Sequence, residues 1–140
     1  MARVRRDVSV VVERAFAIDE ELRVVFHDAL KSAGRHRGGR AYLDSFGVDE
    51  RALDALVDEE SLWVARDGEV VGFGVCSGGV IMGLYVIPTR RRGGIARALV
   101  SEIIATMNPK DAHALPGDRA MKSLYESFGW KARLLTMRAD

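Results

Sequence analysis

Residues 80–96 read VIMGLYVIPTRRRGGIA and predict a buried strand that leads into the start of a helix. Val80–Ile87 is apolar on both faces, which is typical of a strand covered on each side, so we expect it in the middle of a sheet. Gly83 interrupts this strand and indicates a bulge or a close backbone approach. Pro88 ends the strand, and apolar residues at helical spacing follow in Ile95–Met107.

The turn between this strand and this helix has the chemistry of a phosphate site. The first turn of a helix has free N–H groups and a partial positive charge, and small residues let a diphosphate approach them closely. Gly93, Gly94 and Ala96 meet that steric demand. Positive charge comes from Arg90, Arg91, Arg92 and Arg97. The segment lacks the Walker and Rossmann glycine patterns, which disfavours nucleoside triphosphates and NAD. The alternative interpretation is an ordinary strand-to-helix connection with a solvated basic face.

The chain before this stretch predicts a strand, two helices and two more strands. Val8–Val12 is a β-branched run, and Asp19 caps a helix that continues to Gly34. The basic segment 35–40 predicts a loop, and a short helix capped by Asp49 follows. The next predicted strands are Leu62–Ala65 and Val70–Cys76, with turns at Asp67-Gly68 and Ser77-Gly78-Gly79.

Beyond the helix, the pattern predicts a strand, a helix and a strand. Ala112–Leu115 is the short strand, Asp118 caps the helix that ends at Gly129, and Ala132–Met137 is the final strand.

Composition bounds the class of protein. A chain of 140 residues with 48% hydrophobic and 29% charged residues predicts one globular domain over residues 1–140. The net charge of +1 gives no general attraction to nucleic acid or anionic lipid. A lone cysteine, Cys76, allows no internal disulfide, and no apolar run has the length of a membrane span. We therefore expect a soluble cytoplasmic protein in which Cys76 is a small core residue.

Two segments carry a resemblance to a known family. LYVIPTRRRGGIA, residues 84–96, resembles the coenzyme A motif of the GNAT superfamily (GCN5-related N-acetyltransferases), and Arg91, Gly94 and Ala96 match its [RQ]-x-x-G-x-[GA] pattern. LYESFGW, residues 124–130, is similar to the family's L-Y-x-x-x-G-[FW] segment. One predicted helix and one predicted strand separate the two motifs, as that fold requires. The resemblance covers roughly residues 61–138.

The resemblance implies a fold, a cofactor and a reaction. The fold is α/β (α+β) and three-layered, with a mixed, mainly antiparallel sheet flanked by helices on both faces. Acetyl-CoA lies between two splayed strands, and a primary amine on a small molecule or a protein attacks its thioester directly, without a metal. Tyr125 matches the general acid that protonates the departing thiolate. The implied cofactor-binding residues are Leu84, Tyr85, Val86, Arg91, Arg92, Gly93, Gly94, Ile95, Ala96, Arg97 and Asp118.

The sequence departs from the family's pattern at three places. Residues 80–87 contain no carboxylate to deprotonate the amine. The candidates for that base are Glu20, Glu21, His113, Asp118 and Glu126, and the sequence does not choose among them. Asp118 stands where many members have asparagine, and Arg92 replaces a common glycine that the neighbouring Gly93 can restore.

Other interpretations stay open at this stage. A CoA-binding regulatory domain without catalysis fits the missing carboxylate. A toxin that acetylates charged tRNA, or a nucleic-acid module that uses the arginine-rich turns, fits the near-neutral charge poorly. The three histidines lack metal-ligand spacing. Tyr42, Leu43 and Phe46 are candidates for the acceptor side, and either a monomer or a homodimer is expected.

Overall fold

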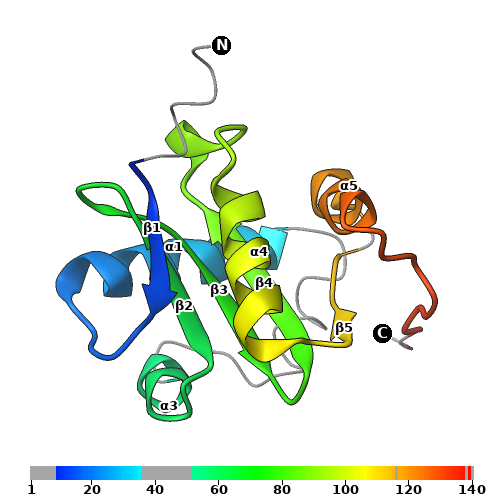
Figure 1. Cartoon of the computed structure of the whole chain (residues 1–140), viewed down its shortest axis with the longest axis horizontal. Helices are drawn as coiled ribbons and strands as arrows, with labels where there is room; N and C mark the ends of the chain where they lie inside the picture. The colour runs from blue at the N-terminus through cyan, green and yellow to red at the C-terminus, as the bar shows by residue number, and fades with distance from the viewer. Residues whose placement is uncertain (1–8, 36–51, 116, 138, 140) are drawn as a thin grey trace.

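A five-stranded mixed sheet forms the centre of the structure, a computed structural model that describes residues 9–35, 52–115, 117–137 and 139 (Figure 1). The strands are β1 (Val11–Arg14), β2 (Leu62–Arg66), β3 (Val70–Ser77), β4 (Val80–Val86) and β5 (Asp111–Ala112), in the order β1-β2-β3-β4-β5. The first four pair antiparallel, and β5 pairs parallel to β4. The helices are α1 (Glu20–Arg35), α3 (Ala52–Asp58), α4 (Ile95–Met107) and α5 (Arg119–Ser127), with a 3-10 turn η2 (Pro88–Arg90) before α4. This is the predicted mixed, mainly antiparallel architecture.

Helices cover both faces of the sheet because alternate strand residues point to opposite sides. In Figure 1, α4 lies in front of the sheet and α1 behind it. On the α4 face, Trp63 and Val71 pack with Leu99 and Ile103 of the helix. On the α1 face, the buried residues are Leu22, Val25, Phe26, Leu53, Leu62, Val64, Val70, Phe73 and Val75, with Ala15. Full burial of one such side chain contributes about 1.5–3 kcal/mol, so the two clusters hold both helical layers onto the sheet.

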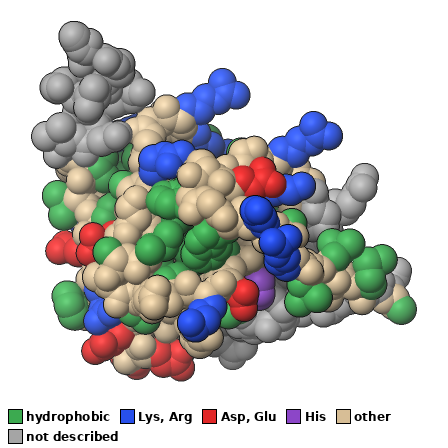
Figure 2. Space-filling model, turned by 45° about the vertical axis from the view of Figure 1, so that its right-hand side comes forward, with side chains coloured by type: hydrophobic (Ala, Val, Ile, Leu, Met, Phe, Trp, Pro, Cys, Tyr) green, Lys and Arg blue, Asp and Glu red, His purple; other side chains and the backbone are tan. Residues whose placement is uncertain are grey.

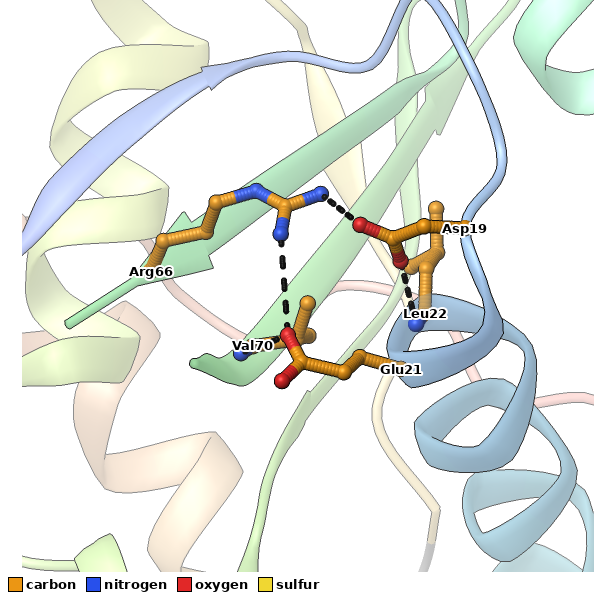
Figure 3. A network of polar contacts seen from close by, with 5 residues as sticks. All are labelled: Asp19, Glu21, Leu22, Arg66 and Val70. Atoms are coloured by element: carbon orange, nitrogen blue, oxygen red, sulfur yellow. Dashed lines mark hydrogen bonds and ion pairs between the residues drawn. The ribbon is translucent and has the colours of Figure 1, made fainter. Parts of the chain in front are cut away.

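The start of α1 is fixed to the β2–β3 hairpin by a polar network (Figure 3). Asp19 Oδ1 accepts a hydrogen bond from the Leu22 N–H at 2.9 Å, as the predicted cap requires. Asp19 Oδ2 lies 3.1 Å from an Arg66 nitrogen, and Glu21 Oε1 accepts from the Val70 N–H at 3.3 Å. The Leu22 N–H, followed by Arg66, lowers the pKa of the Asp19 carboxyl.

The structure corrects the predicted place of the central strand. β3 is the middle strand, and β4 lies between β3 and β5. The side chains of β3 are buried almost throughout, whereas those of β4 from Met82 to Tyr85 are half-buried because that strand borders a cavity. The prediction of an interior strand is confirmed, and so is the bulge: Val75 pairs with Gly83 while Cys76 pairs with Ile81, which leaves Met82 as the extra residue.

The predicted final strand is wrong. Residues 132–137 form no strand, and Leu134 and Met137 are 92% and 82% exposed. β5 contains only Asp111 and Ala112 instead of the predicted Ala112–Leu115, so it offers too short a ladder for a further strand. The predicted two-residue turn at Asp67-Gly68 is also longer, since Arg66 pairs with Val70.

The first strand is Val11–Arg14, so the predicted bounds Val8–Val12 are wrong, although a strand does form there. Val8, residues 36–40 and Asp49 lie outside the described residues, and the remaining helices and strands agree with the sequence patterns. Helix α4 has the predicted bounds, and Cys76 is buried as expected. No helix within the described ranges has the length and hydropathy needed to span a bilayer.

Candidate active site

A cavity of about 640 Å³ opens between β4, the start of α4, the β5–α5 segment and the second half of α1. It reaches both faces of the sheet. Leu84 and Ile95 line it on the α4 face, while Phe26 and Phe73 line it on the α1 face. On the side of the molecule drawn in Figure 2, Lys and Arg side chains stand around hydrophobic side chains.

The two faces connect because β4 and β5 separate after a short paired segment. Val80 pairs with Asp111 and Ile81 with Ala112, and the last bond runs from the His113 N–H to the Ile81 carbonyl at 3.0 Å. Beyond this point, residues 83–86 of β4 pair with β3 on one edge, and no described strand pairs with the other edge. This exposed backbone edge is the splay that the resemblance implies.

The turn before α4 presents unpaired backbone donors to the cavity. Gly94 is the residue before the helix and has φ 90°, a left-handed conformation that favours glycine. The first helical bond runs from the Ala98 N–H to the Gly94 carbonyl at 3.0 Å. The N–H groups of residues 95–97 therefore lack acceptors within the helix. All three residues line the cavity, and two of them, Ile95 and Ala96, have apolar side chains. Such a helix start is suited to bind phosphate.

The arginines of the turn differ in their contacts. Arg90 makes a 2.6 Å ion pair with Asp67 of the β2–β3 hairpin, which holds the turn in place and lowers the pKa of that carboxyl. Arg91 Nε donates to the Val86 carbonyl at 2.8 Å, with the guanidinium 5.4 Å from the centre of the Tyr85 ring.

Arg97 links α4 to α5. Its guanidinium donates to Ser127 Oγ at 2.9 Å and lies 5.1 Å from the centre of the Phe128 ring. Arg92 is exposed and lines the cavity with φ 67°. All four arginines thus line the cavity, and Arg90 also fixes the position of the turn.

The structure brings nearly all the predicted cofactor-binding residues around one cavity. Those that line the cavity are Leu84, Tyr85, Val86, Arg91, Arg92, Gly94, Ile95, Ala96, Arg97 and Asp118. Gly93 is not on the wall, and a Cβ there would lie 3.4 Å from the Arg90 carbonyl. Asp118 Oδ1 accepts from the Met121 N–H at 3.0 Å, so the predicted helix cap forms.

Tyr125 is placed differently from these residues. It is 6% exposed, its ring stacks on Trp130 at 5.8 Å and 15°, and its hydroxyl oxygen is buried. Its neighbours Met121 and Leu124 line the cavity, but Tyr125 itself does not. The assignment of Tyr125 as the general acid stays a prediction.

Among the five candidate bases, two reach the cavity. His113 follows β5 beside the strand split, and Asp118 lies on the same wall. Glu20, Glu21 and Glu126 do not line it. Cys76 lies in the core, where burial raises the pKa of its thiol, so it is unsuited to act as a nucleophile.

The part of the cavity wall that α1 and β3 provide was not predicted from the sequence. These residues are Phe26, Ala29, Leu30, Ser32, Ala33, Phe73 and Val75. The signal in α1 was helical spacing of apolar residues, which indicated burial but not what the helix faces. The proposed acceptor-side residues Tyr42, Leu43 and Phe46 lie outside the described residues. Within the described ranges, no three potential ligands cluster as a metal site.

Comparisons with known proteins agree with this geometry. A family model described as an acetyltransferase (GNAT) domain matches residues 58–132. An acetyltransferase of the GNAT family from Bacillus cereus ATCC 10987 has a TM-score of 0.68 at 18% sequence identity, over 94% of this chain and 89% of that chain. The ribosomal-protein-S18-alanine N-acetyltransferase from Escherichia coli has a TM-score of 0.59 at 14% identity, over 86% and 76%. AAC(6')-Iy, solved with the bisubstrate analog CoA-S-monomethyl-acetylneamine, has a TM-score of 0.57 at 14% identity, over 94% and 98%. A search of curated proteins finds no match.

The matched family and the fold define an acyl-CoA-dependent acetyltransferase. The matched residues include β2, β3, β4, the arginine-rich turn, α4 and α5. The chain therefore belongs to the GNAT family of acetyltransferases.

Proposed function

We propose that the protein transfers the acetyl group of acetyl-CoA to a primary amine by direct attack. This proposal rests on one observation. The same cavity is lined by a cationic helix start, by the open edge of β4 and by apolar side chains of α1 and β3. The structural neighbour AAC(6')-Iy, solved with a CoA-containing bisubstrate analog, supports the choice of cofactor.

The helix start holds the diphosphate of the cofactor in this proposal. The N–H groups of residues 95–97 donate to its oxygens, and Arg91, Arg92 and Arg97 supply positive charge. Arg90 acts indirectly, because its ion pair with Asp67 fixes the turn.

The open edge of β4 binds the pantetheine and the thioester. Residues 84–86 have no strand partner on that side among the described strands, so their backbone groups are available to the amides of the pantetheine, apart from the Val86 carbonyl, which accepts from Arg91 Nε. A main-chain N–H there polarises the thioester carbonyl as negative charge develops on its oxygen. The amine nitrogen forms the new C–N bond, the C–S bond breaks, and the thiolate leaves with the electron pair.

Three proton transfers complete the reaction: the ammonium group loses one proton before attack, its nitrogen loses a second one to water as the amide forms, and the thiolate gains one. Amines of lysine type are almost fully protonated at neutral pH and must lose a proton before attack. His113 accepts it, directly or through water, because it lies on the cavity wall where β4 and β5 separate.

Tyr125 protonates the thiolate in this scheme, and the support for this role is its place in the second family motif. Since its hydroxyl is buried, the side chain must turn toward the cavity to donate.

Calorimetric titration with acetyl-CoA, CoA and ATP tests the cofactor assignment. Binding of both CoA species without ATP is expected. Absence of CoA binding would refute the proposal. CoA binding without thiol release in the presence of amines would favour a regulatory CoA-binding domain, which the buried Tyr125 hydroxyl and the absence of a carboxylate on β4 make the second candidate.

A further inference from the structure

The cavity wall changes from cationic to apolar on the α1 side of the strand split. Helix α1 contributes Phe26, Ala29, Leu30 and Ala33 at helical spacings of three and four residues, together with Ser32. Ala29, Leu30 and Ala33 are half-buried, and the sheet does not cover them completely. A stripe of this kind normally packs against a core. Here Phe26 belongs to the core and Ala29 and Leu30 pack against it, and the same three residues also line the cavity that residues 83–85 of β4 border.

Three aromatic rings in a row line the same end of the cavity. The Phe26 and Phe73 rings are 5.2 Å apart, and the Phe73 and Tyr85 rings are 6.0 Å apart. The row therefore runs from α1 across β3 to β4, and all three side chains line the cavity. Ring faces and edges of this kind favour flat apolar groups.

Negative charge is nearly absent from this cavity. Asp118 is the one carboxylate among its described lining residues, and one of its oxygens already caps α5. The charged residues on the opposite wall are Arg90, Arg91, Arg92 and Arg97. An acceptor with several ammonium groups would have to desolvate them against apolar side chains without a counter-charge, which is unfavourable.

We infer that the acceptor is an apolar primary monoamine, with an aromatic or branched aliphatic group a few bonds from the amino group. This inference rests on the proposed acetyl transfer. The apolar group packs against the α1 stripe and the aromatic row, and the amino group lies at the strand split beside Gly83. The same chemistry occurs in a free arylalkylamine and at a peptide N-terminus that begins with an apolar residue.

Steady-state kinetics with four amines tests the inference. The probes are phenethylamine, a short peptide with N-terminal phenylalanine, spermidine and kanamycin, each with saturating acetyl-CoA. We expect kcat/KM for phenethylamine or the peptide to exceed that for either polycation by about tenfold or more. The two apolar probes separate a small-molecule from a peptide source. Equal or faster acetylation of spermidine or kanamycin overturns the inference.

A pair of variants ties the preference to α1. Ala33→Glu places a carboxylate on the wall, whereas Lys31→Gln makes the same change of one charge at an exposed position that does not line the cavity. Ala33→Glu should shift the ratio of kcat/KM values toward spermidine by about tenfold, with unchanged affinity for acetyl-CoA. Lys31→Gln should leave both unchanged. An unaltered ratio in Ala33→Glu, or an equal shift in Lys31→Gln, contradicts the assignment.

Two further outcomes keep the inference separate from the proposed function. If Ala33→Glu does not fold, Ala29→Glu introduces the same charge one turn earlier on the same wall. If the wild-type protein binds acetyl-CoA but acetylates none of the four amines, both this inference and the proposed transfer fail. If it acetylates only the polycations, the proposed function stands and this inference alone fails.

Discussion

Replacing Gly94 with alanine tests whether the turn before α4 binds the cofactor. A second glycine with the same backbone conformation serves as a control for strain. Gly94 has φ 90°, and an L-residue in the left-handed region is destabilised by about 1–2 kcal/mol. Each kcal/mol lowers Tm by roughly 4 °C in a domain of this size. Gly129 after α5 has φ 89°, and a Cβ there would meet nothing within 4 Å. Gly129→Ala is therefore a control with the same strain outside the cavity.

The two variants should lose similar stability but differ in binding. In Gly94→Ala the methyl group stands on the cavity wall at the unpaired N–H groups and keeps a diphosphate away from them. A hydrogen bond to a charged group contributes about 1.5–3 kcal/mol, so the loss of one such bond weakens CoA binding by about 10–100-fold.

The assay is calorimetric titration with CoA, alongside thermal unfolding of both variants. Gly129→Ala should bind CoA as the wild type does while it unfolds at a similarly lowered temperature. The reasoning is refuted if Gly94→Ala retains wild-type affinity, because the diphosphate would then lie elsewhere. It is also refuted if both variants lose affinity equally, because strain alone would then explain the loss.

Three further predictions concern proton transfer and folding. His113→Gln should lower kcat by about 100-fold at unchanged CoA affinity, and an unchanged kcat excludes His113 as the base. Tyr125→Phe should lower kcat by roughly 10–100-fold at unchanged CoA affinity, and an unaltered rate removes Tyr125 from the mechanism. The pKa of Asp19 is lowered in the folded state, so its contribution to stability is present above the unfolded value of about 4 and is lost as pH falls through the lower folded value. Urea unfolding should thus show Asp19→Ala less stable than the wild type at pH 7, with the gap narrowing in acid; a gap that stays the same as the pH falls contradicts this account.

Local patterns predicted those parts of the fold that depend on neighbouring residues. Glycine and proline positions delimited α4, and the Asp19 and Asp118 side chains accept hydrogen bonds from the backbone as their positions before a helix indicate. Gly83 marked the bulge because a strand interior otherwise disfavours glycine. These features depend on residues that are close together in the sequence, so the folded chain keeps them as predicted.

Features that depend on distant partners could not be read in the same way. Ala132–Met137 has strand composition, but the short β5 gives it no ladder to join. The spacing in α1 predicted an apolar face, yet only the strand order places Ala29 and Ala33 beside the cavity. The motif marked Tyr125, while the packing of its ring on Trp130 determines that its hydroxyl is buried.

The most direct test of the central claim follows thiol release and acetylated product together, with purified protein, acetyl-CoA and phenethylamine. The account predicts that free CoA and N-acetylphenethylamine appear in equal amounts, well above the rate without protein. Thiol release without acetylated amine would contradict acetyl transfer, and no release from protein that binds acetyl-CoA would contradict transfer to an apolar monoamine.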